Sequence, residues 1–268
     1  MTVYKFSEEL NIRLVKGIEQ GYSDYAEVRK EKRDELLVSS AYAWVKGNHI
    51  EDQVARELRE IGIDFKREKA GYAWEYLSFN EPKANNLILI KNANIIKGSS
   101  TQPLLDVLNA DNYLVKLSKI NSSIDFDEVK GGKQGTLTFP DLQIPPISTE
   151  DEEIGKLQKQ YKHFYILSYT IDPLSRMLMD IDLWMPEYIK DSRVEMVQID
   201  SLKKYIGQTG AAVNLEAIQE LVHVADEEFS GTEIEFGFIA LEDIEEETSG
   251  TPVDHGIEEY EEEQEDEV

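Results

Sequence analysis

The sequence contains no cysteine, so disulfide bonds, thiolate zinc sites and cysteine nucleophiles are excluded. Histidine is scarce as well, and its four positions do not give the paired spacing of a helical zinc site: His49, His163, His223 and His255. No apolar run approaches the roughly 20 residues that span a bilayer. The first residues lack the basic-then-apolar pattern of a signal peptide. We therefore expect a soluble cytoplasmic protein that does not bind membranes.

Basic residues are outnumbered, with 28 Lys and Arg against 54 Asp and Glu, for a net charge of −26. Residues 241–268 contain 14 acidic residues and no basic one. Such a protein repels a phosphate backbone, so we expect no direct binding to duplex DNA. The acidic C-terminus favours contact with a basic partner protein, as a mimic of a nucleic-acid backbone, or else serves only for solubility. The candidate binding residues there are Glu258, Glu259, Glu261, Glu262 and Glu263.

Apolar periodicity indicates an alternation of helices and strands over most of the chain. Helical spacing predicts helices at 6–20, 23–45, 49–61, 103–117 and 214–228. We expect Gly21 to end the first helix and Asn48 to cap the third. Strand-like runs occupy 63–69, 72–79, 87–90, 163–171, 177–185, 194–199 and 234–241.

This order predicts an α/β (α+β) fold with a helical N-terminal region, a mixed or antiparallel central sheet built from both halves, and a disordered acidic C-terminal tail. Residues 1–120 form the helical lead-in and a helix-strand-strand-strand core, and 121–153 are a Gly/Pro-rich connection or hairpin. Residues 154–243 form a second α/β half. Residues 244–268 carry too little apolar surface to offset the entropy of ordering.

The helix and three strands within residues 41–93 resemble the core of the restriction-endonuclease-like family. That core has a glutamate on its helix, then an aspartate and an E-x-K motif on its strands, and the resemblance implies an Mg²⁺-dependent nuclease. The candidate catalytic residues are Glu51, Glu57, Glu75, Glu81 and Lys91. Leu89 stands where the family has an acid two residues before the lysine, so the carboxylates do not align as a metal requires. The alternative is surface charge on a similar scaffold.

A second candidate metal site is the pair Asp180 and Asp182. The two alternate on one predicted strand and share a face, which we expect Leu178 and Trp184 to share as well. With Asp172 or Glu187 they would bind a divalent cation. The alternative is the solvated face of an antiparallel strand.

Aromatic residues cluster in sequence around the third helix and the second strand, namely Tyr42, Trp44, Tyr72, Trp74 and Tyr76. The last three alternate and so share one strand face. They form either a platform for base stacking or partner binding, or core packing beneath the helix.

Several longer phrases also resemble a known group of sequences: AYAWVKGNHIE, EKAGYAWEYLSF, HFYILSYTIDPLSRMLMDIDLWMPE and QIDSLKKYI. They are similar to an uncharacterised protein family found in prophages and in defence or toxin–antitoxin neighbourhoods of Gram-positive bacteria. The resemblance implies a bacterial, mobile-element or anti-phage context and transfers no catalytic residue.

Together these features predict a non-enzymatic acidic protein, with no cofactor, that neutralises or regulates a basic nucleic-acid-handling partner, as an antitoxin or inhibitor does. Two alternatives stay open: a divergent metal-dependent nuclease that uses Mg²⁺, and a phage structural or assembly protein.

Overall fold

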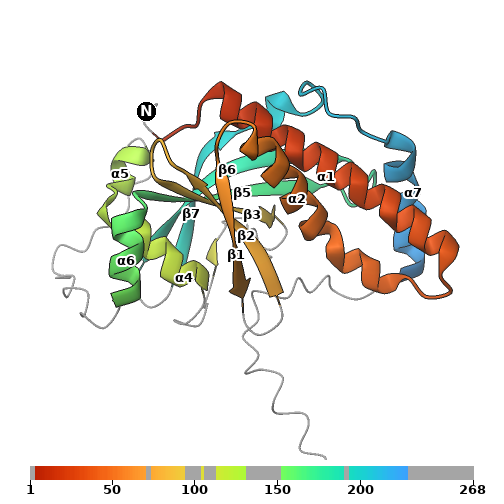
Figure 1. Ribbon diagram of the computed structural model, residues 1–268, viewed down its shortest axis with the longest axis horizontal. Helices are drawn as coiled ribbons and strands as arrows, with labels where there is room; N and C mark the ends of the chain where they lie inside the picture. The colour runs from red at the N-terminus through yellow and green to blue at the C-terminus, as the bar shows by residue number, and fades with distance from the viewer. Residues whose placement is uncertain are drawn as a thin grey trace, which may run out of the picture.

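A mixed β-sheet runs through the centre of the molecule (Figure 1). The computed structural model describes residues 4–70, 74–93, 104–105, 113–130, 152–189 and 193–228. The seven strands lie in the order β1-β2-β3-β5-β6-β7-β4. Their bounds are β1 Asp64–Ala70, β2 Trp74–Glu81, β3 Asn86–Asn92, β4 Leu104–Leu105, β5 His163–Ile171, β6 Leu178–Ile189 and β7 Arg193–Ser201. Among these strands β3 and β5 form the one parallel pair, which joins the two halves of the sequence.

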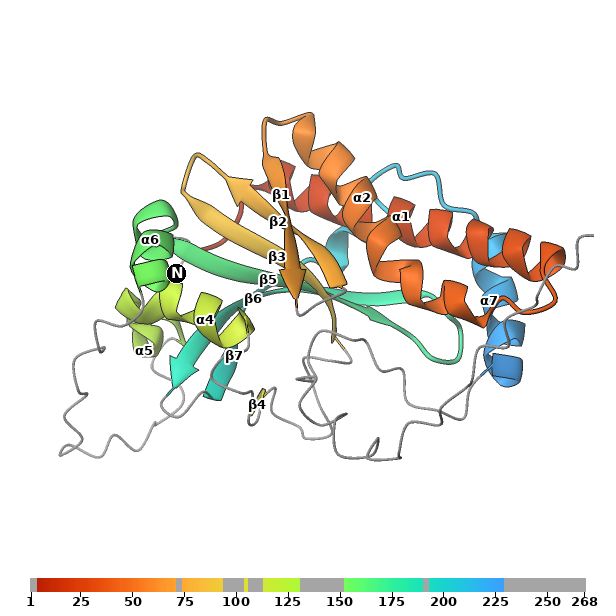
Figure 2. The ribbon, with the colours of Figure 1, turned by 60° about the horizontal axis from the view of Figure 1, so that its bottom comes forward.

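Helices cover both faces of this sheet. Their bounds are α1 Glu8–Glu35, η1 Ser40–Val45, α2 Lys46–Arg59, α4 Tyr113–Ser118, η2 Lys119–Ser123, α5 Phe126–Val129, α6 Glu152–Gln160, η3 Lys203–Tyr205 and α7 Leu215–Glu228. The long helix α1 and its antiparallel neighbour α2 lie together along one side of the sheet (Figure 2). Helices α4, α5 and α6 gather at one end of the molecule and α7 at the other.

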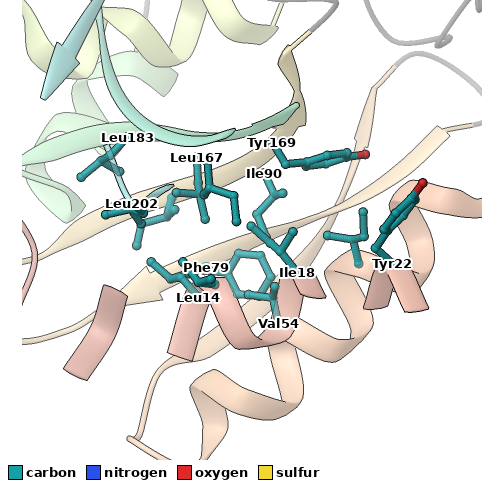
Figure 3. Close-up of a cluster of buried hydrophobic side chains, with 14 of the residues drawn as sticks. Leu14, Ile18, Tyr22, Val54, Phe79, Ile90, Leu167, Tyr169, Leu183 and Leu202 are labelled. Carbon is teal, nitrogen blue, oxygen red and sulfur yellow. The ribbon is translucent and has the colours of Figure 1, made fainter. Parts of the chain in front are cut away.

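The alternation of side chains along the strands produces two separate cores. Between the sheet and the helices α1 and α2 lie Leu14, Ile18, Val54, Phe79, Ile90, Leu167 and Leu183, all buried (Figure 3). On the opposite face, strand residues pack against α4, η2 and α6, among them Leu87, Leu89, Phe164, Ile166 and Trp184. Both faces of β3 and β5 are therefore apolar, as a central strand requires.

Two glycines let the backbones of α1 and α2 come into direct contact. A methyl group at Gly17 would lie 2.6 Å from the Cα of Val54, and one at Gly21 would lie 2.5 Å from the Cα of Ile50. The contact is between backbones, so no side-chain rotation can relieve it. These residues are glycine because the helix pair leaves no room for a Cβ.

The other side of α1 holds the chain that follows β7. Glu19 is buried and accepts hydrogen bonds from the backbone N–H of Gly207, at 2.6 Å, and from the hydroxyl of Thr209. Ser23 Oγ accepts the N–H of Asn214 at 2.8 Å, and the side chain of Asn214 in turn caps α7 at Ala217. Polar residues of α1 thus fix the position of α7.

The predicted fold class is confirmed, but several helix boundaries differ. The predicted helix 6–20 and the first part of the predicted helix 23–45 are one helix, α1, because Gly21 serves the contact with α2 and does not end the helix. The predicted end at residue 45 is wrong, since α1 ends at Glu35 and residues 40–45 form the separate helix η1. The next helix begins at Lys46, so Asn48 lies inside it and is not its cap.

Near the middle of the chain, the predicted helix 103–117 is described only as the short strand β4 and as α4 from Tyr113. The predicted strand 234–241 and the acidic tail lie outside the described residues. In the part of the chain that the structure describes, no helix is long and apolar enough to cross a membrane.

We predict that Gly17→Ala and Gly21→Ala each lower the free energy of unfolding by about 2 kcal/mol or more, measured by urea denaturation. Helix propensity alone favours alanine by about 1 kcal/mol. Overpacking against backbone typically costs about 1–3 kcal/mol or more and is the larger effect. Gly47→Ala is the matched control: Gly47 lies in α2, and a methyl group added there would meet no atom within 4 Å, so this change should stabilise the protein. Equal changes in the free energy of unfolding at all three positions would contradict the backbone contact between α1 and α2.

Candidate functional site

Strands β2 and β3 pair along only part of their length. A backbone N–H of β2 that has no partner on β3 is therefore available to a side chain. Strand β2 pairs with β1 over residues 74–80 but with β3 only over residues 79–81. We call the remaining segment of β2, residues 74–78, the β2–β3 fork. There the N–H of Leu77 donates a 2.8 Å hydrogen bond to the carboxylate of Glu51 on α2. A helix carboxylate therefore supplies an acceptor where β3 does not.

Aromatic rings and a lysine meet at the same fork. Tyr76 stacks on Tyr113 with ring centroids 5.0 Å apart and an interplanar angle of 29°. The ammonium of Lys91 on β3 lies 5.1 Å from the centroid of Tyr76 and 5.5 Å from that of Tyr113. This is the geometry of a cation–π contact, and partial burial strengthens such contacts.

The environment of Tyr76 keeps its phenol protonated. Burial raises the pKa of Tyr76 most, and the charges of Tyr113, Glu68 and Glu51 raise it further. Two carboxylates are thus close enough to act on one phenol. Glu68 was missed by the sequence-based prediction, although the hairpin register opposes it directly to Tyr76.

Of the five candidate nuclease residues, the structure brings Glu51 and Lys91 to Tyr76 at the fork. Glu75 belongs to the fork segment but lies on the other face of β2 from Tyr76, and Glu57 and Glu81 lie outside the fork. Glu57 contacts Arg13 and Lys16, each at 2.7 Å. Burial alone would raise the pKa of Glu57, but hydrogen bonds from these two cations hold it below its ordinary value.

The other two glutamates have structural partners of their own. Glu75 is exposed and lies 3.9 Å from Lys69. Glu81 accepts the backbone N–H groups of Lys83 and Ala84 and so stabilises the β2–β3 turn. Over the residues that the structure describes, no group of three or more histidine or acidic side chains is arranged to hold a metal ion.

The candidate pair on β6 has protein partners. Asp180 accepts a 2.9 Å hydrogen bond from Lys203, and Asp182 accepts one of 2.9 Å from Gln198. Asp182 is only 7% exposed, so this part of the face is buried and not solvated as the alternative interpretation held.

A β-bulge changes which side chains share this face. The pairing of β5 with β6 shifts between Thr170 and Ile171, and Leu178 packs against the core beneath α1 and α2. Leu178 was expected beside the two aspartates. The hydrophobic alternation of the strand did not reveal the shift because a bulge adds a residue without changing the local composition.

The aromatic residues that were predicted to form either one platform or core packing beneath the helix occupy different places. Tyr42 and Trp44 lie in η1, between α1 and α2, and Trp44 is 37% exposed. Tyr76 is half-buried against Tyr113, on the face of the sheet opposite α2. Tyr72, the side chain of Trp74 and the tail glutamates from Glu258 to Glu263 lie outside the described residues.

The raised pKa of Tyr76 predicts a loss of stability in alkali. The phenol stays protonated in the folded chain but ionises near its ordinary pKa of 10.0 when unfolded. Its contribution is therefore fully present below about pH 10 and is lost as the pH rises, by at most about 1.4 kcal/mol per pH unit. We expect Tyr76→Phe to lose less stability than the wild type between pH 10 and 11, in urea denaturation at each pH. If the free energy of unfolding depended on pH in the same way in both proteins, the predicted effect of the Tyr76 phenol would be wrong.

No family model matches the chain, and neither a curated protein nor a solved structure is significantly similar to it. The similarity to a prophage or defence family therefore stays a prediction.

Proposed function

We propose that this chain is an acidic binding protein that engages a basic, nucleic-acid-handling partner protein and neutralises or regulates it. The observation that supports the proposal most is the 14 acidic residues, without a single base, in residues 241–268. A dense line of carboxylates attracts a cationic surface from a distance and accelerates association. The same charges repel nucleic acid, which leaves a basic protein as the fitting partner.

The charge distribution of the described residues supports the same proposal. Three lysines, Lys30, Lys32 and Lys130, each contact two carboxylates, so acids outnumber cations even within these ion pairs. Lys30 lies 2.7 Å from Glu220 and 3.4 Å from Glu216, for example. These lysines are already engaged, so they do little to neutralise the C-terminal carboxylates.

Removal of the tail tests this proposal. We predict that a chain ending at Asp243 binds an oligolysine peptide at least about tenfold more weakly than the full chain at low salt, measured by isothermal titration calorimetry. The full chain should also lose affinity steeply as salt rises, because exposed charges are screened beyond about 8–10 Å. If the two chains bound oligolysine with equal affinity, the tail would not be the part of the chain that binds the basic partner. Tight binding of the full chain to duplex DNA at physiological salt would overturn the proposal altogether.

One observation favours a second candidate, a divergent metal-dependent nuclease. Glu51 on α2 and Lys91 on β3 both act on Tyr76 at the β2–β3 fork, and they are a helix acid and a strand lysine of the kind such an enzyme uses.

If the fork is catalytic, Lys91→Ala should abolish Mg²⁺-dependent cleavage of DNA, followed by gel electrophoresis. Glu75→Ala is the matched control and should cleave normally, because Glu75 is exposed and pairs with Lys69 away from Tyr76. A wild-type chain that degrades no nucleic acid with Mg²⁺ or Mn²⁺ excludes this candidate.

A further inference from the structure

Three consecutive aliphatic side chains lie on the surface where α1 ends. Leu36 is 44% exposed, Leu37 106% and Val38 79%. Single exposed apolar residues are ordinary, but a run of three has no role in the stability of a folded chain and points to a surface that another molecule covers.

This run is held in place at both ends. The N–H of Leu36 bonds to the carbonyl of Lys32 at 3.0 Å and closes the last turn of α1. The carbonyl of Ser39 accepts a 2.7 Å hydrogen bond from the guanidinium of Arg29, which is 1% exposed, and a 3.0 Å bond from the N–H of Tyr42. A buried cation thus fixes the backbone that presents the aliphatic side chains, which lowers the entropy that a partner would have to remove.

An aromatic residue follows on the same connection between the helices. Trp44 lies in η1 and is 37% exposed. An exposed tryptophan and exposed aliphatic residues on one connection have the composition of a protein-binding hot spot. We name Leu36, Leu37, Val38 and Trp44 the connection site.

The most exposed charges beside the connection site are carboxylates. Glu31, Asp34 and Glu35 of α1 have side chains 56%, 64% and 53% exposed. Lys32 lies between Glu31 and Glu35, at 2.8 and 2.6 Å, and these hydrogen bonds raise its pKa. The C-terminal end of a helix also carries partial negative charge.

The second base of this turn is engaged as well. Arg33 lies 3.0 Å from Glu220 on α7 and 3.6 Å from Asp34. Both cations of the last turn are paired and are only 27% and 31% exposed, less than the three carboxylates of the same turn. The carboxylates are therefore the charges that a molecule approaching the apolar run meets first.

We propose that the connection site binds a cationic amphipathic segment of a partner protein. Leu37 and Val38 contact the apolar face of that segment, and Asp34 and Glu35 contact its lysines or arginines. This inference rests on the proposed function and adds to it the place where the body of the chain, as distinct from its tail, meets the basic partner. Anionic lipid does not fit, because these carboxylates repel it.

The test uses the full chain and two synthetic peptides, an amphipathic helix of leucine and lysine and an oligolysine of equal charge. We expect the wild type to bind the leucine–lysine peptide at least about tenfold more tightly in titration calorimetry, because that peptide alone buries apolar surface. The double substitution Leu37→Ser with Val38→Ser should lower this affinity about tenfold, to that of oligolysine, and leave oligolysine binding unchanged. Both side chains are exposed, so the variant should fold, which circular dichroism checks.

Leu174→Ser is the matched control. Leu174 is 82% exposed in the turn between β5 and β6, away from the connection site, and its loss should change neither affinity. Asp34→Asn with Glu35→Gln should weaken binding of both peptides, since it removes charge and keeps the apolar surface.

Each other outcome has a distinct meaning. If neither peptide binds in a salt-dependent manner, the proposed function itself fails. If both bind but Leu37→Ser with Val38→Ser has no more effect than Leu174→Ser, the connection site is refuted and the proposed function stands. Self-association that the double substitution abolishes would assign the site to a second copy of the chain. Faster amide exchange elsewhere in the unliganded variant would assign it to the chain itself, and either result overturns this proposal.

Discussion

Helix α1 has to contact three parts of the molecule at once, and this constraint organises the fold. One side of the helix packs on the sheet, a second meets α2 at backbone distance through Gly17 and Gly21, and a third binds the chain after β7 through Glu19 and Ser23. Any side chain at the two glycines would move α2 outward and open the core beneath it. The apolar surface that α1 and α2 bury against the sheet thus depends on two missing Cβ atoms.

The position of α2 determines the chemistry of the β2–β3 fork. Because α2 is held against α1 and the sheet, Glu51 reaches the backbone of β2 and accepts the N–H of Leu77. On the other face of the same strand, Tyr76 stacks on Tyr113 beneath the ammonium of Lys91. At the fork, an acid thus approaches β2 from one face, and a phenol and a lysine meet on the other.

The sequence predicted the elements well where periodicity was strong and poorly where tertiary contacts decide. Strand β5 was predicted with its observed bounds, because residues 163–171 are rich in the aromatic and β-branched residues that favour strands. Gly21 was interpreted as the end of a helix, since glycine has the lowest helix propensity apart from proline. Position 21 is glycine because a side chain there would collide with the backbone of α2 at Ile50. A local sequence pattern does not reveal such a tertiary contact.

The candidate site was predictable only in part, for the same reason. Lys91 and Glu51 were recognised from the layout of helix and strands, but their common neighbour Tyr76 was assigned to an aromatic platform or to core packing beneath the helix. Its stacking partner, Tyr113, lies far from Tyr76 in the sequence and carries no local signal. The exposed run from Leu36 to Val38 was not recognised either, because apolar residues next to a helix end are indistinguishable from core residues until burial is known.

The parallel pairing of β3 with β5 has a consequence for biosynthesis. The paired residues Asn86 and His163 are separated by 77 positions, so the buried strand β3 leaves the ribosome well before its neighbour exists. Until β5 is synthesised, the β1–β2–β3 meander has an unpaired aliphatic edge, a state that recruits chaperones and favours aggregation. The pairing of two strands that are so far apart in sequence is also slow. Translation up to residue 171 is therefore the interval in which this protein depends most on cellular folding assistance.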